Sequence, residues 1–393
     1  MKYNWTTKKL SEIAYINPRE SIGKGVVAKK VPMDKLQPFC RDVPQFVFEE
    51  YKGGTKFRND DTIMARITPC LENGKVAKVS ILSTDEIGFG STEYIVFRAI
   101  DGVSDADFLY YLICSPLVRN PAIKSMVGSS GRQRVQTDVV ANLDVELPPI
   151  EEQRKIGGVL KTFDDKIKLN NEINNNLLEQ ALTMFSTQFA ALDRNGCIGD
   201  YCSVKSGFAF KSSWWTINGV KVIKIGSINQ DNLNLSECSY VDEDKVDKAK
   251  DFKVIAGDLL IAMTGATIGK FAMVPYSSDT LLVNQRVGKF FLGNNPVEKL
   301  PFIYCTLKQP DVYYEIVNRG QGSAQPNISA SDIMSISCVI PSKEAINKFN
   351  KTLQPLFDLI ISNQRENQQL STLRDSLLPK LMSGELDVSD IDL

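Results

Sequence analysis

The sequence predicts a mixed fold (α+β or α/β) with two globular domains separated by a pair of long antiparallel coiled-coil helices. Three observations lead to this prediction. The two halves of the chain repeat one another, each half contains short strand-like and helix-like segments, and each half ends in a long segment with a heptad pattern. Self-similarity of this kind marks a duplicated structural unit. We therefore expect a pseudo-twofold internal repeat.

The repeat is clearest in residues 151–186 and 344–379, which align without a gap. Identical pairs in this alignment include Leu160 with Leu353, Asp165 with Asp358, Ile167 with Ile360, Asn170 with Asn363, and Asn174 with Asn367. Upstream, four shorter blocks return in the same order. They begin at Leu10, Asp61, Gly74 and Phe108 in the first copy and at Ile198, Asp258, Gly269 and Phe302 in the second. Chance does not explain five blocks in one order, so the pattern indicates a duplication.

Within the first copy, three segments rich in β-branched and apolar residues are predicted strands: Thr62 to Ile67, Val76 to Leu82 and Tyr94 to Ala99. Asp105 is a suitable N-cap for a helix through Cys114, and a second short helix follows Pro116. Residues 143–147 alternate as a further strand. We divide the chain into globular domains at residues 1–148 and 191–341, each followed by a helical region, at 149–190 and 342–393.

A long helix is predicted to begin at Pro149, because proline suits the first turn and Glu151 and Glu152 complement the helix dipole. Positions spaced alternately by four and three then form a heptad seam. The pairing residues of the two seams are Leu160, Ile167, Asn170, Asn174 and Leu177 in the first copy and Leu353, Ile360, Asn363, Asn367 and Leu370 in the second.

The matched asparagines decide between two arrangements of the helices. Each helix could pack on its own domain, or the two could pack on each other as an antiparallel pair. Asparagine in an apolar seam costs stability unless it faces a polar partner, and it then fixes register. We therefore favour the antiparallel pair, and a helix of about 36 residues would make a rod of roughly 54 Å. Arg374 interrupts the second seam, so we expect the pair to fray or to change partner there.

Composition narrows the functional classes. The chain of 393 residues is 43% hydrophobic and 24% charged, and it shows no membrane-spanning run or signal peptide, so we expect a cytoplasmic protein without membrane contact. It contains no histidine, which excludes imidazole as base or ligand. Its 8 cysteines are scattered and suggest no metal site. The net charge of −1 counts mildly against a nucleic-acid binder, unless charge is segregated or partners supply it.

The sequence contains no complete catalytic or cofactor-binding motif. The segment from Gly265 to Phe271 resembles a phosphate loop, but it is one residue too short and carries phenylalanine where serine or threonine must bind magnesium. Asn120-Pro121 begins a methyltransferase-like signature that Ala122 does not continue. We therefore expect no catalytic residues, no metal and no cofactor.

Three motifs carry a family resemblance. Leu147-Pro-Pro-Ile-Glu-Glu-Gln-Arg-Lys-Ile, the following Phe163-Asp-Asp-Lys-Ile, and the tail from Leu373 to Leu386 resemble specificity subunits of type I restriction-modification systems. The resemblance covers the whole chain. It implies two target-recognition domains, each reading half of a bipartite double-stranded DNA site, with the helices setting the gap. It also implies two methyltransferase subunits and restriction subunits as partners, which would perform the chemistry with S-adenosylmethionine and ATP. The second copy has a degraded docking motif at Pro341, so docking there is expected to differ.

Two glycine-rich loops at equivalent places carry arginine and glutamine, which suit phosphate clamping and base reading. The candidate DNA contacts are Lys75, Lys124, Arg132, Gln133 and Arg134 in the first copy and Lys270, Asn284, Gln285, Arg286, Arg319, Gln321 and Gln325 in the second.

Two other functions are weighed against DNA recognition. A coiled-coil adaptor without a DNA role accounts for the helices but not for the two loops. A self-contained methyltransferase lacks both the motifs and the chain length for a catalytic domain.

Overall fold

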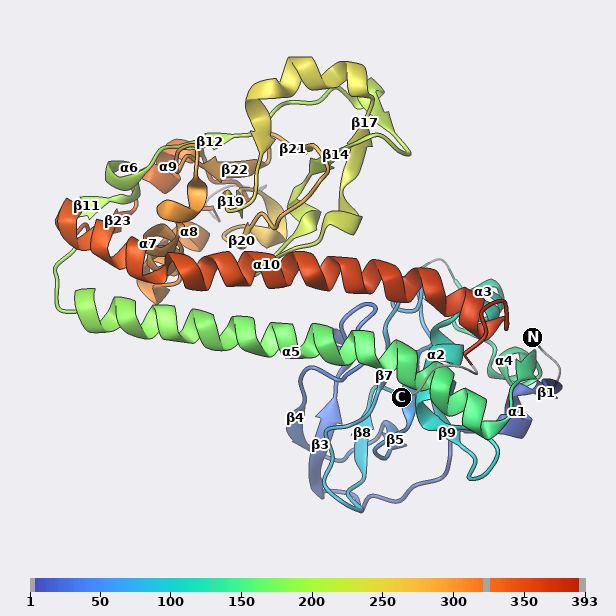
Figure 1. Ribbon diagram of the computed structural model, residues 1–393. Helices are drawn as coiled ribbons and strands as arrows, with labels where there is room; N and C mark the ends of the chain where they lie inside the picture. Colours follow the sequence, from blue (N-terminus) through green and yellow to red (C-terminus); the bar gives the residue numbers. More distant parts are fainter. Residues whose placement is uncertain (1–3, 130, 321–325, 389–393) are drawn as a thin grey trace. The chain divides into compact units, whose positions relative to one another are not determined.

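The computed structural model describes residues 4–129, 131–320 and 326–388. The chain divides into two compact units. Unit 1 comprises Met1–Ile167 with Leu370–Leu393, and unit 2 comprises Lys168–Gln369. Two long helices, α5 (Ile150–Phe189) and α10 (Lys343–Met382), each contribute one segment to unit 1 and one to unit 2. Figure 1 shows the course of both helices along the chain.

Unit 1 contains two four-stranded sheets and a two-stranded ribbon, in the orders β2-β9-β6-β7, β4-β3-β8-β5 and β1-β10. Its strands are β1 (Thr6–Lys9), β2 (Ala14–Ile16), β3 (Val27–Val31), β4 (Val47–Glu50), β5 (Thr55–Phe57), β6 (Thr62–Ala65), β7 (Val76–Lys78), β8 (Gly88–Gly90), β9 (Tyr94–Ala99) and β10 (Asp144–Leu147). Its short helices are α1 (Leu10–Ile13), α2 (Ala106–Cys114), α3 (Pro116–Lys124), α4 (Thr137–Ala141) and the 3-10 turn η1 (Met33–Lys35).

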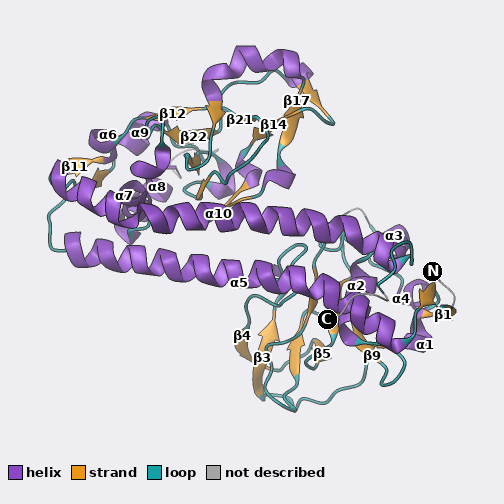
Figure 2. Ribbon diagram, in the orientation of Figure 1, coloured by secondary structure: helices purple, strands orange, loops and turns teal. Residues whose placement is uncertain are grey.

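Unit 2 repeats this plan with additions, in the orders β12-β22-β19-β20, β13-β17-β14-β21-β18, β11-β23 and β15-β16 (Figure 2). Its strands are β11 (Gly196–Cys197), β12 (Val204–Ser206), β13 (Trp215–Thr216), β14 (Val220–Ile223), β15 (Ile228–Asn229), β16 (Asn232–Leu233), β17 (Ser239–Val241), β18 (Lys253–Val254), β19 (Leu259–Ala262), β20 (Phe271–Met273), β21 (Leu281–Val283), β22 (Val287–Phe290) and β23 (Ser337–Cys338). Its short α-helices are α6 (Ile198–Tyr201), α7 (Leu300–Leu307), α8 (Pro310–Gly320) and α9 (Ala330–Met334). Its 3-10 helices are η2 (Ser212–Trp214), η3 (Ile225–Ser227), η4 (Leu235–Glu237), η5 (Glu243–Phe252), η6 (Gly265–Thr267) and η7 (Pro296–Glu298).

The duplication is visible strand by strand. The first sheet of each unit is antiparallel throughout, and the second sheet contains one parallel pairing, β3 with β8 in unit 1 and β14 with β21 in unit 2. Asp61 and Asp258 occupy the same place before β6 and β19. Each is buried and pairs with a cation on the neighbouring strand, Arg98 in unit 1 and Lys289 in unit 2. The predicted mixed fold and internal repeat are confirmed, with mainly antiparallel sheets.

Several predicted elements of unit 1 are confirmed in detail. Strand β9 has the predicted bounds, whereas β6 and β7 end before Ile67 and Leu82. Asp105 caps α2, since its side chain accepts hydrogen bonds from the backbone N–H groups of Asp107 and Phe108. Within the part of the chain that the structure describes, every helix falls short of the combination of length and hydropathy that a membrane span needs.

The segments of α5 and α10 that belong to unit 2 lie side by side and antiparallel (Figure 1). Asn363 donates a hydrogen bond to Asn174 across the pair at 2.9 Å, and Asn170 donates to Asn367 at 2.9 Å. All but Asn367 are buried, and Asn367 is half-buried. The predicted asparagine pairing is therefore confirmed, and it fixes the register of this segment.

Arg374 corrects one expectation about the second helix. Helix α10 continues without fraying to Met382, and within unit 1 Arg374 forms a buried ion pair with Asp164 on α5. Tyr111 also donates a hydrogen bond to Asp164, at 2.6 Å. Of the two expected outcomes, fraying does not occur, because the charge that interrupts the apolar seam has a buried carboxylate opposite it. Beyond Arg374, Leu381 and Met382 pack into the core of unit 1, as a change of partner requires.

Candidate nucleic-acid interface

One end of the first sheet of unit 1 gathers most of the predicted contact residues. Strand β6 is antiparallel to both neighbours, so the end of β6 meets the beginnings of β7 and β9. A segment that we call strap 1, residues 127–129 and 131–135, crosses this end. It is tied down by hydrogen bonds from the N–H of Thr68 to the carbonyl of Gln133, at 3.0 Å, and from the N–H of Val135 to the carbonyl of Arg66, at 2.8 Å.

The predicted cationic contacts of unit 1 differ in their exposure and in their hydrogen-bond partners. Arg132 on strap 1 is exposed, and so is Lys124, which ends α3. Arg134 is half exposed and forms a forked pair with Glu93, whose two carboxylate oxygens lie 2.6 and 2.9 Å from the guanidinium nitrogens. This hydrogen-bonded pair holds the pKa of Glu93 below its usual range. Lys75 donates to the backbone carbonyl of Met33 at 2.8 Å, so the structure places it partly within the fold.

Sequence reasoning missed Arg66 at this site. Arg66 directly follows β6 and donates from Nη2 to the carbonyl of Val135 at 3.3 Å, while its Nε is buried without a described hydrogen-bond partner. A polar residue that directly follows a buried strand is a pattern from which this position could have been predicted. It was overlooked because the predicted strand ran on to Ile67.

Unit 2 builds the same end from different residues. Strand β19 ends at Ala262, beside the beginnings of β20 and β22. Lys270 directly precedes β20, and the turn Asn284–Arg286 directly precedes β22. The N–H of Met263 bonds to the carbonyl of Arg286 at 3.0 Å, and the N–H of Ile328 bonds to the carbonyl of Met263 at 2.9 Å. The structure therefore brings the Asn284–Arg286 turn and Lys270 together, with Gln285 and Arg286 exposed.

The structure does not place the other three predicted contacts of unit 2 in this turn. Arg319 lies in the last turn of α8 rather than in a glycine-rich loop. Its guanidinium pairs with Glu315 and donates a hydrogen bond to the carbonyl of Asp332 at 2.9 Å, so the side chain is held in place. Gln321 and Gln325 lie outside the described residues.

The backbone conformation of the two Gly-Lys turns explains why both copies have glycine before the lysine. Gly74 and Gly269, which precede Lys75 and Lys270, have φ angles of 76° and 83°, in the left-handed region that favours glycine. In unit 2 the resemblance to a phosphate loop resolves into the single 3-10 turn η6 between two antiparallel strands. The turn thus presents a lysine at the end of the sheet.

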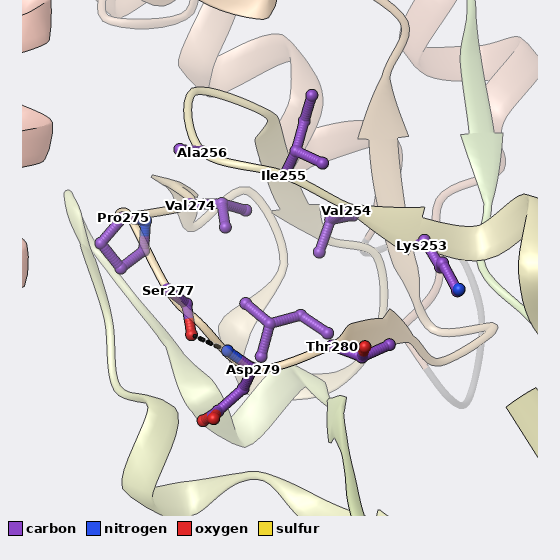
Figure 3. A pocket seen from close by; sticks show the side chains of 10 residues that line it. Lys253, Val254, Ile255, Ala256, Val274, Pro275, Ser277, Asp279 and Thr280 are labelled. Atoms are coloured by element: carbon purple, nitrogen blue, oxygen red, sulfur yellow. Dashed lines mark hydrogen bonds between the residues drawn. The ribbon is translucent and has the colours of Figure 1, made fainter. Parts of the chain in front are cut away.

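A hollow in unit 2 offers no catalytic arrangement. Its wall consists of Lys253 to Ala256, Val274, Pro275, Ser277 and the segment from Asp279 to Leu281 (Figure 3). Asp279 is the one carboxylate in this lining, and its N–H bonds to the hydroxyl of Ser277 at 3.1 Å. In the part of the chain that the structure describes, no group of three or more histidine, cysteine, aspartate or glutamate residues could hold a metal ion.

Comparisons with known proteins match both copies. The model of the type I restriction modification DNA specificity domain matches residues 2–179 and 194–372. The MjaIX specificity subunit of a type I restriction enzyme from Methanocaldococcus jannaschii is 28% identical over 74% of this chain and 71% of its own length. The EcoAI specificity subunit from Escherichia coli is 22% identical over 93% of this chain and 80% of its own length.

A solved structure shares the fold. The S subunit of a type I restriction-modification system from M. genitalium superposes with a TM-score of 0.52, at 16% identity, over 96% of each chain.

Proposed function

The chain belongs to the type I restriction-modification DNA specificity family, and on that premise we propose that the sheet end of each unit reads one half of a bipartite DNA site. Membership makes the chain a non-catalytic DNA-recognition subunit with two target-recognition domains, because catalysis in these systems resides in other subunits. We assign these domains to residues 1–148 and 191–341 and the helical regions to residues 149–190 and 342–393.

One observation carries the assignment of the reading surface. Both units place exposed polar and cationic residues at the equivalent end of the first sheet, but the residues themselves differ. Unit 1 presents Arg132 and Arg134, and unit 2 presents Gln285 and Arg286. Arginine recognises guanine and phosphate, and glutamine recognises adenine. Different side chains on a common frame are what two different half-sites require.

We further propose that the helix pair sets the distance between the half-sites. The asparagine contacts fix the register of one segment of the pair, and the buried Arg374–Asp164 ion pair fixes the other. Since an α-helix rises 1.5 Å per residue, a pair locked in register would hold a constant spacing.

The family places this subunit in complexes with modification and restriction subunits. We propose that two methyltransferase subunits dock on it, with the altered motif at Pro341 giving the second site different contacts. S-adenosylmethionine and ATP would then act in the partners. Such a complex would work in the cytoplasm, and the partners would supply part of the positive potential that a chain of net charge −1 lacks.

The test removes the two exposed arginines of strap 1, in complex with the methyltransferase subunits. Replacing Arg132 and Arg134 by alanine should weaken binding to a duplex that carries the methylated motif and lower the salt slope by up to about two. The control replaces Lys8 and Lys9 by alanine, because both lie on β1, outside this end of the sheet. Equal slopes for the two variants would contradict the assignment.

A further inference from the structure

Unit 2 carries an aromatic cluster that has no counterpart at the same place in unit 1. Phe208 stacks on Trp214 with ring centroids 6.0 Å apart and planes inclined by 13°, and Phe210 packs against Trp215 at 5.5 Å. All of these rings follow β12 in the chain. In unit 1, residues 17–26, which follow the equivalent strand β2, contain no aromatic residue.

Three lysines are held over these indole rings. The ammonium of Lys224 lies 3.5 Å from the ring centroid of Trp215, and those of Lys248 and Lys211 lie 5.3 and 5.8 Å from the centroid of Trp214. Attraction between an ammonium and the face of an aromatic ring holds each side chain in place without neutralising its charge.

These three lysines have no carboxylate within ion-pair distance among the described residues, whereas nearby lysines do. Lys245 also lies over Trp214 but pairs with Asp244, and Lys221, on the same strand β14 that Lys224 follows, pairs with Asp279. Lys211 and Lys248 are exposed, and Lys224 is half-buried. The charges of Lys211, Lys224 and Lys248 therefore remain available to an anion.

Backbone hydrogen bonds connect this cluster to the proposed reading turn of unit 2. The N–H of Asn284 bonds to the carbonyl of Ile223, directly before Lys224, at 3.0 Å. The N–H of Gln285 bonds to the carbonyl of Phe208 at 2.9 Å. Backbone hydrogen bonds thus hold the Asn284–Arg286 turn next to the residue before Lys224 and next to Phe208 of the cluster.

We propose that Lys211, Lys224 and Lys248 bind DNA phosphates flanking the half-site read by unit 2, with the two indoles acting as supports that hold the ammonium groups. This inference rests on the proposed function and deepens it. Phosphate contacts position a protein on the duplex and carry no sequence information. The aromatic cluster would therefore give unit 2 a larger share of the sequence-independent affinity than the equivalent region of unit 1.

The test measures binding of the complex with its methyltransferase subunits to two duplexes, one with the methylated motif and one of random sequence. The Lys211→Gln, Lys224→Gln, Lys248→Gln variant should bind both duplexes more weakly by a similar factor. Its salt slope should fall by up to about 2.7, since each phosphate contact contributes about 0.9. The matched control, Lys8→Gln, Lys221→Gln, Lys245→Gln, removes the same charge from outside the proposed set and should retain the slope.

Intrinsic fluorescence gives a second readout. The chain contains 3 tryptophans, so Trp5→Phe leaves Trp214 and Trp215 as its own reporters, and a matched complex that also carries Trp214→Phe and Trp215→Phe gives the partner emission to subtract. In that background the motif duplex should cause a saturable change in emission, which the triple variant Lys211→Gln, Lys224→Gln, Lys248→Gln loses. An unchanged slope in the triple variant, while the Arg132/Arg134 variant weakens binding, would overturn this inference alone. Failure of the wild-type complex to bind the motif duplex would overturn the proposed function as well.

Discussion

Asparagine side chains between the two long helices show how single residues fix an arrangement. A leucine seam would give more stability but would tolerate several registers. A buried asparagine amide needs a hydrogen-bond partner, so a pair of facing asparagines permits only one register. Asn174 and Asn363 meet in this way within unit 2, and both are at least 90% buried. The sequence allowed this pairing to be predicted because the same seam positions are asparagine in both copies.

Breaking one asparagine pair should cost more than removing both of its members. Asn174→Ala leaves the amide of Asn363 buried without its partner, which costs about 1–3 kcal/mol. The double variant Asn174→Leu, Asn363→Leu should recover most of that loss. Urea unfolding of the full chain measures both, with exposed Asn175→Ala as the control. A double variant less stable than the single one would contradict the pairing.

The ion pair of Arg374 with Asp164 should behave similarly in unit 1. Both side chains are more than 90% buried, so Arg374→Met leaves an uncompensated carboxylate and should cost about 3–5 kcal/mol. Adding Asp164→Asn removes that charge and still offers an acceptor to the hydroxyl of Tyr111, so it should restore part of the stability. Exposed Arg365→Met on the same helix is the control. Equal losses for Arg374→Met and Arg365→Met in thermal unfolding would argue against the pair.

The pair of Arg134 with Glu93 predicts a pH dependence. Because the pKa of Glu93 is lowered in the folded chain, its contribution to stability is present above the usual glutamate pKa and is lost as the pH falls through the lowered value. Carbon NMR of the Glu93 carboxyl should therefore show a titration midpoint below that of an exposed glutamate. Arg134→Ala should return the midpoint to the usual range, and an unchanged midpoint would mean that the pair does not persist in solution.

At the level of elements, the sequence predicted what local chemistry specifies. Strand β9, the cap of α2 and the start of α5 follow from β-branched runs, an aspartate and a proline that act within a few residues. By contrast, Arg374 is buried because it pairs with Asp164, which lies far away in the sequence. Arg319 is held by a hydrogen bond to Ser335, which lies beyond the end of its own helix. No local pattern reveals such partners, so the sequence did not predict these contacts.

The same limit applies to the candidate interface. Repetition of the Gly-Lys turns and of the loops indicated that the candidate residues of the two copies lie at equivalent places, because aligned copies place equivalent residues together. It could not show that Lys75 would donate to a backbone carbonyl, nor that Phe208 would adjoin Gln285. Those contacts join residues that lie far apart in the sequence, so no local pattern reveals them.

The helix pair gives an element-scale prediction about DNA. Duplicating residues 167–173 and, in the facing helix, 364–370 adds a heptad to each helix and preserves the existing contacts. The pair should lengthen by about 10 Å, and the gap between half-sites should grow by about three base pairs. Sequencing of the methylated sites reports the gap directly. An insertion of seven residues after Asp193, in the exposed loop beyond α5, should leave the gap unchanged.

At the scale of the whole molecule, one plan appears twice with different surfaces. The frame residues repeat, including the Asp61 and Asp258 ion pairs, the Gly-Lys turns and the helix seams. The exposed residues diverge, since unit 1 offers two arginines on a strap and unit 2 offers a Gln-Arg turn beside an aromatic-lysine cluster. A near-neutral net charge is compatible with this design because the cations are concentrated locally, and under the proposed assembly the partner subunits would supply further positive charge.

The most direct test of the two-reader account is the DNA motif methylated when this chain is produced with its methyltransferase subunits in a host that lacks other methylation. We predict two short specified blocks separated by a gap of fixed length and unspecified sequence. A variant with Arg286→Ala and Gln285→Ala should relax one block and leave the other intact. A single uninterrupted motif, or relaxation of both blocks together, would contradict the account.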